Sequence, residues 1–275
     1  MKKEKLKNYN QKVLAILGTL GIILVLTGIF TFGGIIISEY FRYQNYETQE
    51  TGILSQEKVE ELQKEKKREQ VISLETPRLI DTLKSTYIIP VSHKTLNEKE
   101  DTSELLNAFN SVEKISKSNR RRYSKSYYGS YNNIIISSPK ESKNNKIFNN
   151  RVNFNHIATE YFEDDILLLL KVSKKDTNKD GIINLKDFKS LFIYSFKSKD
   201  LREIQLDGYD VNSYKFIHES KDLIVSFGMD KNENGGFESY NEPTILKKYS
   251  FKGKVLTDLV EQKIVNELQK TLEGS

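Results

Sequence analysis

The sequence predicts a mainly β protein with an N-terminal transmembrane helix, antiparallel β-blade repeats and a C-terminal amphipathic helix. Three observations predict this class. A long uncharged apolar run lies near the N-terminus, two later segments repeat at a spacing of 54 or 55 residues, and an apolar stripe at helical spacing ends the chain. The repeats would form a partial or small propeller, whose blades are antiparallel sheets of about 40–50 residues.

Length and composition exclude several classes of protein. The 275 residues allow one or two domains. The absence of cysteine excludes disulfide scaffolds, Cys-ligated zinc and thiol catalysis. The net charge of +5 is concentrated at the N-terminus, where residues 1–38 hold five lysines against one glutamate. Since the rest of the chain is nearly neutral, the charge gives no reason to expect a nucleic-acid partner.

Residues 13–38 carry no charged side chain and are predicted to span a membrane. A helix rises ~1.5 Å per residue, so roughly 20 residues cross the hydrocarbon core. The run is too long for the apolar core of a cleaved signal peptide, which is about 7–15 residues. Because the lysines precede the span, residues 1–12 are predicted to be a cytoplasmic tail and the C-terminal part to lie outside. The Lys-, Asn- and Ile-rich composition suits a bacterium, so the expected location is the inner membrane with an extracytoplasmic, or periplasmic, domain.

Two segments of different character are expected between the span and the repeats. Residues 39–70 are interpreted as a helical stalk, because good helix formers dominate residues 55–70. Residues 97–131 are interpreted as an irregular insert that contains a short amphipathic helix after Asp101. The Arg- and Tyr-rich residues 116–133 are interpreted as a solvated surface loop. Stacking on single-stranded nucleic acid or contact with an anionic glycan or lipid headgroup are the alternatives.

Two segments, Ile166–Leu201 and Asp222–Leu256, resemble each other. Each begins with an apolar run, continues with an acidic loop containing glycine, and ends in Tyr-Ser-Phe-Lys. The predicted β-repeat domain, residues 71–256, has room for three or four blades of this length. A closed propeller needs about 4–8 blades, so an open stack, or closure by a partner, is as consistent with the length as a complete ring.

The acidic loops have the residue pattern of calcium-binding loops. Calcium takes about 6–8 oxygen ligands, and alternating Asp and Asn residues direct every second side chain inward. The ligands predicted in the first loop are Asp176, Asn178, Asp180, the carbonyl of Ile182, Asn184 and Asp187. Those predicted in the second loop are Asp230, Asn232, Asn234, the carbonyl of Gly236, Glu238, and either Asn241 or Glu242. The alternative is that both loops are Asx-rich turns that hold no ion.

Residues 160–256 resemble the repeats of bacterial periplasmic propeller proteins of the TolB-like or WD40-like kind. The segment KFIHESKDLIVSFGMD, residues 215–230, has the strand, short polar turn and strand of that family. Residues 218–223 depart from the family pattern S-P-D-G-x-x-L. The two loops resemble integrin-type or EF-hand-like calcium loops set between strands. The resemblance covers about a third of the chain and implies a fold, structural calcium and a binding role, but no reaction.

The last residues, 257–275, predict an amphipathic helix. Thr257 can cap its N-terminus, and Gly274 follows as a stop. The apolar stripe is made by Leu259, Val260, Ile264, Val265, Leu268 and Leu272. Such a stripe either covers the open edge of the last blade or docks a partner.

No catalytic motif accompanies these features. His93, His156 and His218 lack the spacing of a zinc hydrolase, so neither an enzyme nor an organic cofactor is expected. The sequence favours a membrane-anchored envelope protein whose external, calcium-stabilised β-repeat domain binds or scaffolds a protein partner. Its oligomeric state is left open. The alternatives are a cell-envelope hydrolase, or its accessory subunit, and a calcium-responsive sensor.

Overall fold

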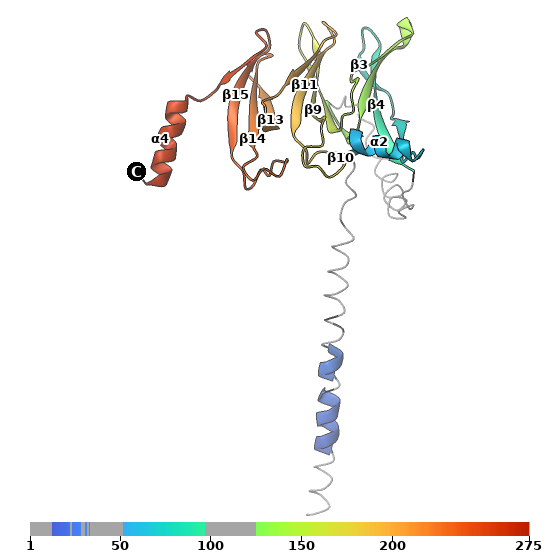
Figure 1. Ribbon diagram of the computed structural model, residues 1–275, viewed down its shortest axis with the longest axis vertical. Coiled ribbons are helices and arrows are strands. Elements are labelled where there is room, and N and C mark those ends of the chain that lie inside the picture. Colours follow the sequence, from blue (N-terminus) through green and yellow to red (C-terminus); the bar gives the residue numbers. More distant parts are fainter. Residues whose placement is uncertain are drawn as a thin grey trace, which may run out of the picture. The chain divides into compact units, whose positions relative to one another are not determined.

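The computed structural model in Figure 1 describes residues 13–22, 24–28, 31, 33, 52–96 and 125–274. The chain forms two units, residues 1–50 and residues 51–275. In the first unit the described residues are helical. The hydroxyl of Thr19 donates to the carbonyl oxygen of Ile16 at 2.9 Å, which satisfies this polar side chain within the helix.

The predicted membrane span is described only in part. Residues 23, 29, 30, 32 and 34–38 lie outside the described residues. Among the described residues, no helix is both long and apolar enough to cross a bilayer. The span therefore stays a prediction.

The second unit contains three antiparallel sheets of four or five strands, which confirms the prediction of a mainly β, antiparallel fold (Figure 1). The first sheet comprises β2 (Gln70–Leu74), β3 (Arg78–Asp81), β4 (Thr86–Thr95), β6 (Asn133–Ser138) and β7 (Lys143–Lys146). The second comprises β5 (Ser126–Tyr131), β8 (Phe154–Tyr161), β9 (Ile166–Ser173), β11 (Lys189–Ser195) and β12 (Leu201–Ile204). The third comprises β13 (Tyr209–Phe216), β14 (Leu223–Met229), β15 (Thr244–Ser250) and β16 (Val255–Asp258).

The remaining described elements of this unit are short. They are β1 (Ile53–Leu54), β10 (Ile182–Ile183), the 3-10 helix η1 (Pro139–Glu141) and the helices α2 (Gln56–Lys64) and α4 (Gln262–Glu273). Strands β1 and β10 pair with each other as a two-stranded antiparallel ribbon. This ribbon joins the start of the unit to the first acidic loop.

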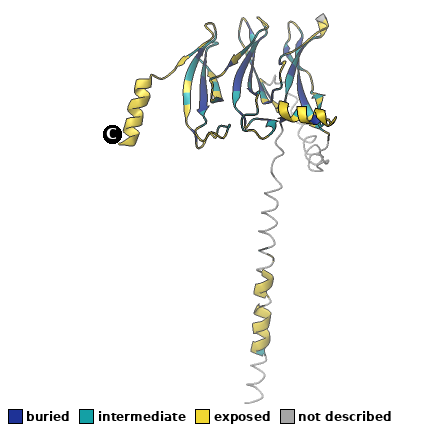
Figure 2. Ribbon diagram, in the orientation of Figure 1, coloured by how far each residue is buried: buried dark blue, intermediate teal, exposed yellow. Residues whose placement is uncertain are grey.

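The sheets pack face to face through two apolar cores, and β9 contributes to both. Leu168 and Leu170 lie in the core shared with the first sheet, whereas Leu167 and Leu169 lie in the core shared with the third. All four side chains are fully buried. Figure 2 shows the burial of the strands in dark blue. A strand that is buried on both faces reads as a continuous apolar run, which explains the sequence Ile-Leu-Leu-Leu-Leu.

The repeated Tyr-Ser-Phe-Lys motif closes equivalent hairpins in the second and third sheets. Ser195 Oγ accepts the N–H of Ser198 at 3.1 Å, and Ser250 Oγ accepts the N–H of Gly253 at 3.2 Å. A carboxylate that precedes the neighbouring strand also accepts a backbone N–H of each turn. Asp165 accepts that of Lys197, and Asp222 accepts that of Phe251, both at 2.9 Å. The motif is therefore explained by turn formation. Asp165 is 8% exposed.

The predicted irregular insert, residues 97–131, is partly wrong. Residues 126–131 form β5, which pairs with β8 in the second sheet. Tyr127 and Tyr131 are buried in the core between the first two sheets, and the ring of Tyr131 lies over Gly129. The expected helix after Asp101 and the arginine cluster at 120–122 lie outside the described residues.

The described part of the predicted stalk, residues 52–70, also differs from the prediction, whereas residues 39–51 lie outside the described residues. Helix α2 ends at Lys64, and Gln70 already belongs to β2. Ile53, Ser55 and Leu62 are buried, because residues 52–70 pack into the second unit rather than extending from it as a spacer.

The C-terminal helix begins later than predicted. Thr257 lies in β16, because residues 255–258 pair with β15, and α4 starts at Gln262 without a side-chain cap. Gly274 ends the helix with φ +77°, as expected. None of the α4 side chains is buried, so the expectation that the helix covers the last blade is wrong for this structure (Figure 2).

Candidate metal centre

The first acidic loop connects β9 to β11 and folds back on its own backbone. Asp176 accepts the N–H groups of Asp180 at 3.1 Å and Gly181 at 2.8 Å through its two carboxylate oxygens. Asn178 also accepts the N–H of Asp180, and Asp180 accepts that of Ile182 at 2.8 Å. Gly181 has φ +87°, a conformation that glycine adopts without the steric cost of a Cβ. The alternating side chains thus form a tight set of Asx turns.

Asp187 closes this loop from its far end. One carboxylate oxygen accepts the N–H groups of Thr177 at 2.7 Å and Asn178 at 3.2 Å, and the other accepts that of Asn184 at 2.8 Å. Its side chain is fully buried. Burial raises the pKa of Asp187, against the lowering effect of these hydrogen bonds. Predicted as the last ligand, Asp187 is used here as a clamp on the loop backbone.

The second loop, between β14 and β15, repeats this scheme. Asp230 accepts the N–H of Gly235, and Asn232 accepts that of Asn234, both at 2.9 Å. Asn234 accepts the N–H of Gly236, also at 2.9 Å.

Glu242 takes the place of Asp187 as the clamp of the second loop. It accepts the N–H groups of Lys231 at 2.7 Å, Asn232 at 3.3 Å and Glu238 at 2.9 Å. The N–H of Glu238 contributes most to lowering the pKa of Glu242. Asp176 and Asp230 are 54 positions apart, whereas Asp187 and Glu242 are 55 apart, so the extra residue of the second repeat lies inside its loop.

The two loops contact each other, which the sequence did not indicate. The hydroxyl of Thr177 donates to the carbonyl oxygen of Gly235 at 2.5 Å. Asp187 and Gly236 form an isolated antiparallel bridge. A hollow of about 380 Å³ is lined by residues of both loops, including Asn178, Asp230 and Asn234. All twelve predicted ligands therefore lie in or at the end of two loops that contact each other. Two of the twelve, Asp187 and Glu242, are the clamps.

The N-terminal segment of the second unit reaches the first loop as well. Ile53 and Leu54 of β1 pair with Ile183 and Ile182 of β10. The N–H of Ser55 donates to the carbonyl oxygen of Gly181 at 2.9 Å. The Gly52 Cα lies so close to this loop that an added Cβ would be 2.4 Å from Ile182 Cγ2. The first loop thus tethers the segment that follows the predicted span.

Oxygen donors of the loops suit a hard cation such as calcium. Asp230 Oδ1 is buried and has no hydrogen-bond partner among the described residues. An unpaired carboxylate oxygen is costly to bury, and a cation would compensate it. No group of three or more His, Asp or Glu side chains in the described ranges is placed to hold a metal ion. The loops instead combine carboxylates with Asn side chains and backbone carbonyls.

The three histidines are placed far from one another in the topology. His93 lies on β4 of the first sheet, and its Nδ1 is 3.1 Å from Asn132 Oδ1. His156 lies on β8 and stacks on Tyr128 with ring centroids 4.5 Å apart. His218 lies in the exposed turn between β13 and β14.

Comparisons with protein-family models, with curated proteins and with solved structures find no match to this chain. The resemblance to propeller repeats therefore stays a prediction.

Proposed function

We propose that this chain is a single-pass membrane protein whose external β-repeat domain is stabilised by calcium and binds or scaffolds a protein partner in a bacterial cell envelope. The observation that carries the proposal is the pair of adjacent loops with equivalent hydrogen-bond schemes. A repeated loop that keeps both its acidic residues and its clamp fits a structural ion better than an ordinary turn.

The proposed calcium sites use the alternating positions of each loop. Asp176, Asn178, Asp180, Asn184 and the carbonyl of Ile182 would hold the first ion. Asp230, Asn232, Asn234, Glu238 and the carbonyl of Gly236 would hold the second. Calcium supplies positive charge that offsets the repulsion between the carboxylates of each loop. Asp187 and Glu242 would keep the loop backbone in place, since their oxygens accept its N–H groups.

Ion binding at this position would stabilise the packing of the sheets rather than drive a conformational change. The first loop is bonded to the second loop through Thr177 and to the N-terminal segment through Gly181. An ion that orders both loops would join the second sheet, the third sheet and residues 52–55. A permanent structural role fits an external, calcium-rich compartment.

Exposed apolar surface supports the binding role. Ile72 and Leu74 on β2 are 76% and 60% exposed, and Leu268 and Leu272 on α4 are 64% and 82% exposed. Contiguous apolar side chains at the surface of a soluble domain commonly mark a contact with another protein. The uncharged residues 13–38 supply the proposed anchor.

Thermal unfolding of the full chain in neutral detergent tests the calcium proposal. Saturating calcium should raise Tm by about 5–10 °C relative to excess chelator, since an ion at 100-fold its Kd adds about 2.7 kcal/mol. Asp176→Ala and Asp230→Ala should each lose part of that increase. Glu267→Ala, which removes an exposed carboxylate of α4, is the matched control and should keep all of it. Equal melting curves in calcium and in chelator would contradict the proposal.

A further inference from the structure

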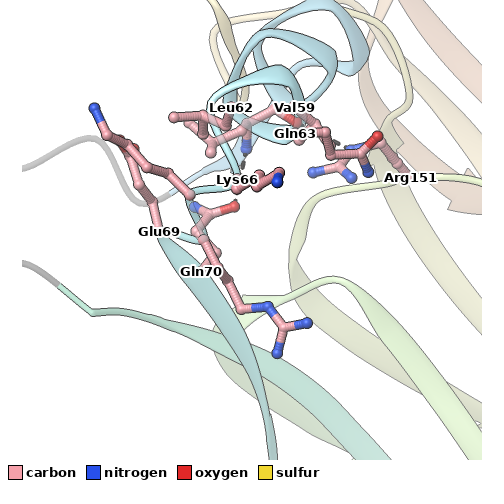
Figure 3. A pocket seen from close by; sticks show the side chains of 10 residues that line it. Val59, Leu62, Gln63, Lys66, Glu69, Gln70 and Arg151 are labelled. Carbon is pink, nitrogen blue, oxygen red and sulfur yellow. Dashed lines mark hydrogen bonds between the residues drawn. The ribbon is translucent and has the colours of Figure 1, made fainter.

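A second hollow, of about 390 Å³, lies at the C-terminal end of α2. Its apolar side is formed by Leu54, Val59 and Leu62. The rest of its lining is strongly basic and includes Lys66, Arg68 and Arg151. In Figure 3, Lys66 lies between Glu69 on the left and Arg151 on the right. The hollow therefore combines an apolar wall with positive charge from two separate parts of the chain.

Among the described residues, carboxylates offset only part of the positive charge of this hollow. Lys67, which also lines it, pairs with Glu65 at 2.8 Å. Lys66, Arg68 and Arg151 form no salt bridge with a carboxylate among the described residues. Glu69 is the one carboxylate among the described residues that line the hollow. Three unpaired cations around one hollow repel one another, and an anion would relieve that repulsion.

Arg151 is the least expected of these cations, because it is partly buried. Its Nε donates to the carbonyl oxygen of Leu54 at 3.0 Å, which fixes the direction of the guanidinium. Burial lowers the pKa of Arg151, which reflects the cost of removing its charge from water. A guanidinium held in this way presents its remaining N–H groups in a planar fork that suits phosphate oxygens.

We propose that this hollow binds a phosphate group, which Lys66, Arg68 and Arg151 would hold while Leu54, Val59 and Leu62 contact an apolar part of the ligand. The phosphate can belong to an anionic lipid headgroup or to a free phosphate ion. An apolar wall beside the cations favours the lipid, because free phosphate makes no use of it. This site is separate from the acidic loops and does not rest on calcium binding.

Calorimetric titration of the full chain in an uncharged maltoside detergent tests the proposal. The probes are dihexanoyl phosphatidic acid, inorganic phosphate and dihexanoylglycerol, which has the same acyl chains and no phosphate. Lys66→Gly and Arg68→Gln should each weaken binding of phosphatidic acid by about tenfold, as expected for one lost charged hydrogen bond. Lys66 has φ +55°, where glycine is readily accepted, so Lys66→Gly removes the charge without straining the fold. Lys64→Gln, at the last residue of α2 and outside the hollow, should bind as wild type.

The arms of this experiment separate the two sources of phosphate. Tighter binding of phosphatidic acid than of phosphate assigns the site to a lipid headgroup, and equal binding assigns it to free phosphate. The proposal is overturned if neither phosphatidic acid nor inorganic phosphate binds, or if dihexanoylglycerol binds as tightly as phosphatidic acid. It is also overturned if Lys64→Gln weakens binding as much as Lys66→Gly does.

Discussion

Thr177 and Gly235 join the two acidic loops at a point where only glycine fits. An added Cβ on Gly235 would lie 2.1 Å from the carbonyl oxygen of Thr177, well inside van der Waals contact. Gly235 also has φ +80°. The backbones of two loops that are 58 residues apart in sequence therefore meet directly, and the hydroxyl of Thr177 closes the contact.

Gly235→Ala should destabilise the protein more than Gly181→Ala does. Both glycines have a positive φ, which costs an alanine about 1–2 kcal/mol. Gly181 has open space where its Cβ would be, whereas at Gly235 the first loop must also move. We expect the free energy of unfolding, measured by urea denaturation, to fall by at least about 1 kcal/mol more in Gly235→Ala. Equal losses would show that the loops separate at little cost.

Glu242→Gln should make stability less sensitive to acid. Hydrogen bonds from the loop backbone lower the pKa of Glu242 below its ordinary value of 4.5. A carboxylate of this kind stabilises the fold above its unfolded pKa, and the stabilisation is lost as pH falls through the folded pKa. We therefore expect a smaller drop in Tm between pH 7 and pH 3 for Glu242→Gln than for wild type. Glu267→Gln on α4 should show the wild-type drop, and an unchanged drop in Glu242→Gln would contradict the assigned clamp.

Leu169→Ala should be among the most damaging substitutions in the cores. Its side chain is fully buried between the second and third sheets, and truncation leaves a cavity there. The expected loss is about 2–5 kcal/mol in the free energy of unfolding. Leu74→Ala, at a site that is 60% exposed, should cost less than about 1 kcal/mol. Similar losses for both would contradict the packing of the sheets.

The sequence predicts a strand best where burial of its faces produces a simple pattern of apolar residues. Strand β9 was found because both of its faces are buried and its first five residues, 166–170, are all apolar. Strand β5 was missed because Gly129 and its Tyr- and Ser-rich surroundings read as a loop. In the structure Gly129 makes room for the ring of Tyr131, whose hydroxyl donates to the carbonyl oxygen of Tyr128 at 2.9 Å. A glycine can occupy a strand because an aromatic ring packs over it. The alternation of polar and apolar residues along the strand does not reveal such a contact.

The acidic loops were predictable residue by residue, but their surroundings were not. The alternation of Asp and Asn identifies the Asx turns of Asp176 and Asp230 directly. The contact between Thr177 and Gly235 depends on how two sheets stack, and the pairing of Ile53 with Ile183 depends on residues 130 positions apart. Neither relationship leaves a local pattern. The two clamps, Asp187 and Glu242, occupy equivalent places in the fold but different positions in their loops. Their predicted role as ion ligands stays a prediction.

Calcium binding at the two proposed sites should be coupled. Ordering the first loop fixes Thr177 and Asp187, which hold Gly235 and Gly236 of the second. The ion that binds second would then meet a loop that the first ion has already helped to order, so its binding costs less conformational entropy. Asp230→Ala should therefore weaken calcium binding at the first loop by about fivefold or more, and Asp176→Ala should weaken the second by the same factor, because coupling is reciprocal.

Thr177→Val separates this coupling from the sites themselves. Valine keeps the size of the side chain and removes the hydroxyl that reaches Gly235. The same hydroxyl also contacts Asp187 and accepts the N–H of Phe188 within the first loop, but all of the proposed ligands remain. Calorimetric titration of the full chain should still show two ions bound to Thr177→Val. In that background, Asp230→Ala should weaken the first site less than it does in wild type, because only the Asp187–Gly236 bridge still joins the loops. If the two sites are already independent in wild type, the contact between the loops carries no free energy between them, whereas a lack of any binding would refute the calcium sites instead.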